Sequence, residues 1–79
     1  MRNTYTVNNG YFTIQNNGFK LTTVVTATII RSDGLWVGYS VFPRITTAGY
    51  VDVYVRDASG NLPANNSSIE CSFVCYNPQ

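Results

Sequence analysis

The feature that most constrains the fold is the strict alternation of side-chain type through residues 20–43. Before the pair Asp33-Gly34, one set of alternate positions holds Leu21, Thr23, Val25, Ala27 and Ile29. After the pair, the corresponding set holds Leu35, Val37, Tyr39 and Val41. Period-two alternation on both sides of an Asp-Gly turn is a strong hairpin signal. We therefore predict a long central β-hairpin, turning at Ser32-Asp33-Gly34, with one face buried.

The first third of the chain contains two similar turns, Asn8-Asn9-Gly10 and Asn16-Asn17-Gly18. Asn-Gly favours a tight primed turn because both central residues of such a turn need positive φ. Residues 4–7 and 11–15 flank the first turn and have the length of short strands. We expect them to form a meander that enters the long hairpin.

The second half predicts two more strands. Pro43 should end its strand or place it at a sheet edge, with residues 44–48 as a connector. Residues 49–56 form a strand with Val51, Val53 and Val55 on the core side, and residues 57–61 have turn chemistry. Residues 68–76 form the last strand, and no segment has helical periodicity. The prediction is an all-β chain, a small antiparallel β-sandwich or barrel forming a single domain over residues 1–79.

Charge and composition do not favour a highly charged partner. Only 11% of the residues are charged and the net charge is +1, without a basic run. These values favour neither nucleic acid nor an anionic membrane as a partner. The start Met1-Arg2-Asn3-Thr4 leads directly into polar residues, so we expect no signal peptide, and no apolar stretch is long enough to span a bilayer.

Two cysteines, Cys71 and Cys75, fall on one face of the predicted last strand. Four residues of strand separate them by roughly 13 Å, whereas the Cα atoms of a disulfide lie within about 7 Å of each other. We expect two free thiols, buried as small hydrophobic groups, in a protein that folds in a reducing cytoplasm. Pairing of either thiol between subunits is the alternative.

The sequence lacks the usual elements of a catalytic or metal site. It contains no His, and its acids are Asp33, Asp52, Asp57 and Glu70. Their spacing supports no carboxylate pair, and no Ser or Thr has an identifiable base. The turn at 57–61 lacks the alternating acidic ligands of a calcium loop. We expect no catalytic residues, no metal and no cofactor.

Aromatic residues are the remaining candidates for function. If the valines face the core, Tyr50 and Tyr54 lie on the opposite face with Arg56, and Trp36 and Phe42 share one face of the hairpin. Three interpretations of such a face are open: a sister subunit covers it, it recognises a ligand, or it is exposed without a specific role. Tyr and Trp beside Asn and Ser are typical of protein interfaces and sugar sites.

In composition and in its turns, the chain resembles the C-terminal tip domains of bacteriophage tail fibres and tailspikes. The resemblance rests on an Asn-, Thr-, Ser- and Tyr-rich composition, on tight Asn-Gly and Asp-Gly turns, and on the run YVDVYVRDASGNLP at residues 50–63. It implies a homotrimer whose subunits bury aromatic faces against one another. It also implies that the tip binds a cell-surface glycan or protein, or clamps the trimer together.

Two functional hypotheses follow. The first is a non-enzymatic structural and receptor-binding module of a virion, trimeric, in which Trp36→Ala weakens assembly. The alternative is a monomeric small binding protein, such as a phage-encoded inhibitor or a lectin-like domain, with the aromatic residues open to a partner.

Overall fold

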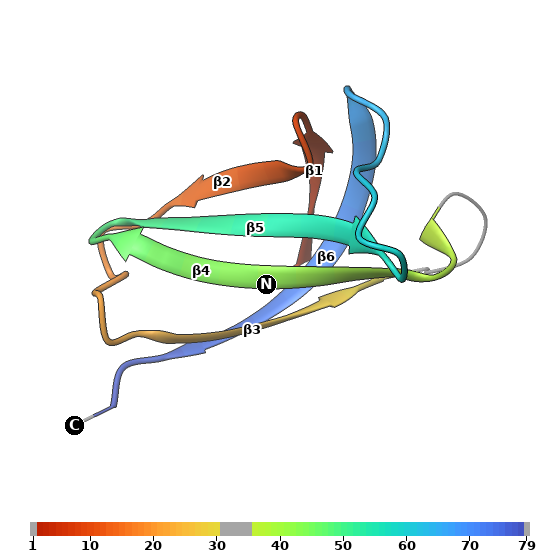
Figure 1. Cartoon of the computed structure of the whole chain (residues 1–79). Helices are drawn as coiled ribbons and strands as arrows, with labels where there is room; N and C mark the ends of the chain where they lie inside the picture. Colours follow the sequence, from red (N-terminus) through yellow and green to blue (C-terminus); the bar gives the residue numbers. More distant parts are fainter. Residues whose placement is uncertain (1, 31–35, 79) are drawn as a thin grey trace.

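The computed structural model describes residues 2–30 and 36–78, which form two antiparallel three-stranded sheets. The strands are β1 (Arg2–Val7), β2 (Tyr11–Gln15), β3 (Val24–Ile29), β4 (Tyr39–Thr47), β5 (Tyr50–Asp57) and β6 (Ser67–Tyr76). One sheet has the order β1-β6-β3 and the other β2-β5-β4, and β6 crosses behind the β4–β5 pair (Figure 1). The predicted small all-β sandwich is confirmed.

The prediction that the two arms of the central hairpin pair with each other is wrong. β3 pairs with β6 and β4 pairs with β5, so the two arms lie in different sheets. The expected turn at Ser32-Asp33-Gly34 lies outside the described residues. Alternation determines which side of a strand is buried, but it does not choose the neighbouring strand. Residues 20–23, expected to begin the first arm, belong to the loop before β3.

The predicted meander at the start of the chain is also wrong, although its first turn is correct. Asn9 and Gly10 both have positive φ, 56° and 80°, and Asn8 and Tyr11 exchange two backbone hydrogen bonds of 3.1 Å. This turn joins the two sheets, since β1 pairs with β6 and β2 with β5.

The second Asn-Gly pair, Asn17-Gly18, has no positive φ. There the Asn16 Oδ1 accepts a hydrogen bond of 2.8 Å from the Gly18 amide. An Asn side chain can close a turn in this way without the primed backbone conformation.

Pro43 lies at a sheet edge, as one alternative predicted, but it does not end the strand. β4 continues through Arg44 and, after an irregularity in its register, reaches Thr47 opposite Tyr50. Residues 44–47 therefore belong to a strand and not to a connector. An edge strand tolerates Pro because only one of its sides needs backbone donors.

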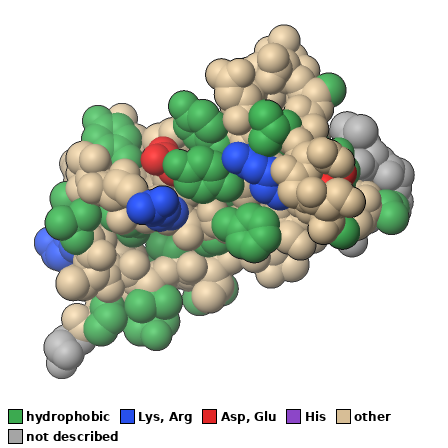
Figure 2. All heavy atoms as spheres, viewed as in Figure 1, with side chains coloured by type: hydrophobic (Ala, Val, Ile, Leu, Met, Phe, Trp, Pro, Cys, Tyr) green, Lys and Arg blue, Asp and Glu red, His purple; other side chains and the backbone are tan. Residues whose placement is uncertain are grey.

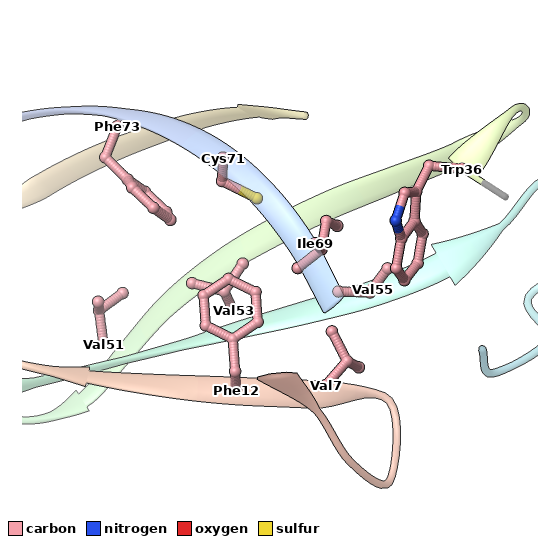
Figure 3. Packing of buried hydrophobic residues seen from close by; sticks show 9 residues of the cluster. All are labelled: Val7, Phe12, Trp36, Val51, Val53, Val55, Ile69, Cys71 and Phe73. Atoms are coloured by element: carbon pink, nitrogen blue, oxygen red, sulfur yellow. The ribbon is translucent and has the colours of Figure 1, made fainter. Parts of the chain in front are cut away.

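The core lies between the sheets and is built mainly from the inner positions of β5 and β6. Among the described residues, those buried in it are Val7, Phe12, Trp36, Val51, Val53, Val55, Ile69, Cys71 and Phe73. The three β5 valines are fully buried, as predicted. Phe73 and Val51 lie at one end of the cluster and Trp36 at the other (Figure 3).

Trp36 belongs to this core and does not share an exposed face with Phe42. It is 6% exposed, whereas Phe42 is 54% exposed. Trp36 precedes β4 rather than lying within it, so the strand period does not set its direction. Its Nε1 donates to the Ser68 carbonyl oxygen at 2.9 Å, which satisfies the indole inside the sandwich.

The turn after β5 is held by one carboxylate. The Asp57 Oδ1 accepts hydrogen bonds from the Asn61 and Ser59 amides, at 2.8 and 2.9 Å. The Asn61 amide makes the largest contribution to lowering the pKa of Asp57. Because these bonds favour the charged carboxylate, they weaken as the pH falls through the lowered pKa. The predicted turn at 57–61 is confirmed.

Replacing Trp36 with Ala should destabilise the fold itself. Truncating a buried Trp leaves a cavity, and the expected loss in free energy of unfolding is about 3–5 kcal/mol. Val37→Ala is the matched control, because Val37 is 64% exposed, and its loss should stay below about 0.5 kcal/mol. Urea denaturation followed by circular dichroism measures both, and equal losses would contradict the burial of Trp36.

Candidate binding surface

The outer side of the β2-β5-β4 sheet gathers most of the predicted functional residues. Along β5, positions 50, 52, 54 and 56 alternate with the buried valines and point outward. Tyr54 is paired with Tyr11 of β2 and with Phe42 of β4, so the three rings form one row across the sheet. We call the surface formed by Tyr11, Phe42, Tyr50, Tyr54 and Arg56 the aromatic face.

The aromatic face is accessible. Phe42, Tyr50 and Tyr11 are 54%, 42% and 40% exposed. The Tyr11 and Tyr54 ring centroids are 5.6 Å apart and their planes are tilted by 37°. Cross-strand aromatic pairs stabilise a sheet and hold the rings in fixed positions. The contact between Tyr11 and Tyr54 therefore limits the rotation of these two rings.

Arg56 is fixed beside the middle of the row, two residues from Tyr54 along β5. Its Nη1 donates to the carbonyl oxygens of Gly10 and Val55 at 2.6 and 2.8 Å. Its Cζ lies 5.7 Å from the centroid of the Tyr54 ring, within the range of a cation–π contact. Among the described residues, both of these bonds use Nη1, and a guanidinium carries further N–H donors on its other nitrogens.

A polar row lies beside the aromatic row. Thr13 Oγ1 donates to Asp52 Oδ1 at 2.7 Å, and Arg44 is paired with Asp52 in the strand register. Figure 2 shows this face, with hydrophobic side chains beside basic and acidic ones. The surface combines flat apolar groups with hydrogen-bonding groups, the composition found in binding sites for proteins and sugars.

Two asparagine contacts hold the Arg56 end of this face. The Asn9 amide donates to Asn65 Oδ1 at 2.9 Å, and the Asn66 amide donates to Asn8 Oδ1 at 3.0 Å. They join the β1–β2 turn to the loop before β6. Gly10 in that turn is the residue whose carbonyl oxygen binds Arg56.

The structure brings four of the five predicted site residues together. Phe42, Tyr50, Tyr54 and Arg56 lie on the aromatic face, whereas Trp36 lies in the core. Sequence reasoning missed Tyr11, although its alternation with the buried Phe12 indicated an outward direction. Its position beside Tyr54 depends on strand order, which alternation does not give.

The two cysteines are free, as predicted, but only Cys71 is buried; Cys75 is exposed. The expectation that both are buried is therefore wrong. Cys75 lies outside the core, near the end of β6, where it is paired with Val25 at the start of β3. Burial, followed by the charge of Glu70, raises the pKa of the Cys71 thiol to about 11.

Across residues 2–30 and 36–78, no group of three or more His, Cys, Asp or Glu residues could hold a metal ion. The described strands and loops include no helix long and apolar enough to cross a bilayer. Asp33, one of the four acids, lies outside the described residues.

Replacing Gly10 with Ala should disturb the Arg56 anchor. A Cβ on Gly10 would lie 2.4 Å from Arg56 Nη1 and 2.6 Å from Leu62 Cδ2, at a φ of +80°. Gly38→Ala is the control, because Gly38 has a φ of +79° but no atom within 4 Å of the added Cβ. Both variants should lose about 1–2 kcal/mol from backbone strain, and Gly10→Ala should lose more. Equal losses in urea denaturation would show that Arg56 and Leu62 move aside freely.

The two thiols should differ in reactivity. At pH 8, three pH units below a pKa of about 11, about one Cys71 thiol in a thousand is ionised. Iodoacetamide should therefore modify one thiol in the native protein and both in urea, as read by mass spectrometry. Cys75→Ser should abolish the native modification. Rapid native labelling in that variant would contradict the burial of Cys71.

The chain was compared with protein-family models, with curated proteins and with solved structures. None of the three comparisons found a match. A functional proposal for this chain therefore depends on the geometry and chemistry of its own residues.

Proposed function

We propose that the chain is a non-enzymatic binding module whose working surface is the aromatic face. One observation carries this proposal: rings from three adjacent strands form a row beside an anchored arginine, with a half-buried Tyr54 between the exposed Tyr11 and Phe42. Aromatic residues and Arg are enriched in interfaces and supply most of their binding energy.

The first occupant of the aromatic face is a second copy of this chain, within a homotrimer. This assembly fits a structural and receptor-binding module of a virion, the function implied by the resemblance to tail fibre and tailspike tips. Burial of the aromatic face against a sister subunit would remove the exposed area of Phe42 and Tyr50 from water, which favours association. The other surfaces of the trimer would then be available to a cell-surface glycan or protein.

A monomeric binding protein is the second candidate, and the position of Trp36 favours it. The largest aromatic residue completes a core made by one chain, with its indole hydrogen bond satisfied internally. Such a chain needs no partner to bury this residue. The aromatic face and its polar row would then recognise a protein or sugar directly, as an inhibitor or a lectin-like domain does.

Light scattering coupled to size exclusion tests the trimer. The wild type should have the mass of a trimer across a wide range of concentrations, and Phe42→Ser should dissociate at concentrations where the wild type remains assembled. Loss of a large interface side chain weakens association by about 2 kcal/mol or more, roughly thirtyfold. Val74→Ser is the matched control, because Val74 is 64% exposed on the other sheet.

Two outcomes would contradict trimer assembly through this face. A wild type that is monomeric at every concentration would exclude the trimer, and the monomeric binding protein would be the remaining candidate. A trimer that Val74→Ser dissociates and Phe42→Ser does not would place the interface on the β1-β6-β3 sheet.

A further inference from the structure

The chain carries nearly the same short sequence twice, in two different structural settings. Asn8-Asn9-Gly10 is followed by Tyr11, and Asn16-Asn17-Gly18 is followed by Phe19. These contain the two Asn-Gly pairs of the sequence. An Asn-Gly pair is chemically labile, because glycine has no Cβ to keep its backbone nitrogen away from the preceding asparagine side chain. The fold therefore decides which of the two pairs can react.

The reaction needs water and no catalyst. The backbone nitrogen of the glycine attacks the side-chain carbonyl carbon Cγ of the asparagine and forms a C–N bond. The bond from Cγ to Nδ2 breaks, and ammonia leaves with the proton that the glycine nitrogen loses. Water then opens the cyclic imide at either of its two carbonyl carbons, which gives aspartate or isoaspartate. Both products carry a new carboxylate, and in isoaspartate the main chain passes through the former side chain.

The first pair lies in a turn that leaves it little freedom. Asn9 and Gly10 have φ of 56° and 80°, and the Asn9 amide donates to Asn65 Oδ1 at 2.9 Å. Gly10 is buried, and its carbonyl oxygen accepts hydrogen bonds from the Val55 amide at 2.8 Å and from Arg56 Nη1 at 2.6 Å. Attack on Asn9 Cγ requires the peptide unit between Asn9 and Gly10 to rotate, and the bonds on both of its sides oppose this rotation. Asn9 therefore reacts only after the turn opens locally.

The second pair is exposed and is held by fewer bonds. Asn17 and Gly18 both lie at the surface without positive φ, in a turn that the Phe19 amide closes by donating to the Asn16 carbonyl at 3.0 Å. The Gly18 carbonyl accepts one long hydrogen bond, of 3.4 Å, from Asn77 Nδ2. Within the described part of the chain, the Asn17 side chain makes no hydrogen bond. No side-chain bond therefore has to break before its Cγ approaches the Gly18 nitrogen.

One hydrogen bond opposes attack at the second pair. The Gly18 amide donates to Asn16 Oδ1 at 2.8 Å, and this bond retains the proton that the nitrogen must lose. Both residues are exposed, so water replaces the Asn16 side chain at a small net cost. This bond therefore slows the reaction at Asn17 less than the bonds of the buried Gly10 slow the reaction at Asn9.

We propose that Asn17 is a site of spontaneous modification, converted through a cyclic imide to aspartate and isoaspartate in the folded protein, while the turn at Asn9 protects the matching pair. Either product takes one unit from the net charge of +1. The proposal does not depend on the function assigned to the aromatic face.

Isoaspartate at position 17 should loosen the contact of this turn with the β4–β5 turn. Gly49 accepts a hydrogen bond from the Asn16 amide at 2.9 Å and donates one to the Phe19 carbonyl at 2.8 Å. The two turns lie beside each other at the left end of the molecule (Figure 1). One extra main-chain atom between Asn16 and Phe19 changes the spacing of their bonding groups. The modification therefore acts on the Tyr50 end of the aromatic face, next to Gly49.

Peptide mapping of the aged wild type tests the proposal. Protein kept in mildly alkaline buffer, either native or in urea, is digested at intervals. Mass spectrometry detects the gain of about 1 Da at each site, and electron-transfer fragmentation separates aspartate from isoaspartate. In the native protein, Asn17 should react at least about tenfold faster than Asn9, which must wait for local opening. In urea the two rates should agree within about twofold, because the neighbouring residues are nearly the same.

Gly18→Ala identifies the attacking nitrogen. Gly18 has no positive φ, and an added Cβ would lie 3.2 Å from Asn16 Oδ1, so the variant should fold. Its methyl group crowds the nitrogen, so the rate at Asn17 should fall while the rate at Asn9 stays unchanged.

Protein NMR of the aged wild type reads the effect on the aromatic face. The amide signals of Gly49 and Tyr50 should shift in the fraction of molecules that contain isoaspartate, and the amide signal of Arg56 should not. Unshifted Gly49 and Tyr50 signals would contradict the effect on the aromatic face.

Three results would overturn the modification of Asn17. The first is an equal rate at Asn9 and Asn17 in the native protein. The second is a difference between the two sites that persists in urea, because the local sequence and not the fold would then cause it. The third is a product that is aspartate alone, formed at a rate that Gly18→Ala does not change, because water would then attack the side chain directly.

Discussion

The structure depends on the packing of β5 against β6, the central strands of the two sheets. Every alternate residue of β5 from Val51 to Val55 is fully buried, and Ile69, Cys71 and Phe73 of β6 provide the opposing surface. Each central strand is paired on both sides, and each of the other four strands is paired with one of these two. Burial of these two inner faces supplies most of the apolar contact in a domain of this size, where little surface is available to bury.

This arrangement explains which parts of the fold the sequence could predict. The alternation in β5 and β6 is a local property, and it correctly indicated both strands and their buried sides, except for Cys75 near the end of β6, which is exposed. The partner of β3 is a non-local property: β6 is long enough to pair with β1 through residues 67–72 and with β3 through residues 71–76. Nothing in the alternation of residues 20–43 distinguishes pairing with β6 from pairing across a hairpin. The Asn9-Gly10 turn was predictable because positive φ is a property of those two residues.

The same distinction applies to the aromatic face. The outward direction of Tyr50, Tyr54 and Arg56 follows from the alternation in β5, and the sequence showed it. The row itself requires β2 and β4 to flank β5, and this strand order brings Tyr11 and Phe42 beside Tyr54. Trp36 was misplaced because it lies before β4, where the strand period no longer determines side-chain direction.

The two sides of β5 face different environments. Val51 lines an open cleft between the two sheets, while its neighbours Tyr50 and Asp52 lie on the outer side of the sheet. Gly49, directly before Tyr50, is joined by two backbone hydrogen bonds to Asn16 and Phe19, which also line the cleft. The Tyr50 end of the aromatic face is therefore held by this loop, whereas the Arg56 end is held by Gly10 and the asparagine contacts. The two ends of the aromatic face thus depend on different loops, and the Tyr11–Tyr54 contact between them depends on the pairing of β2 with β5.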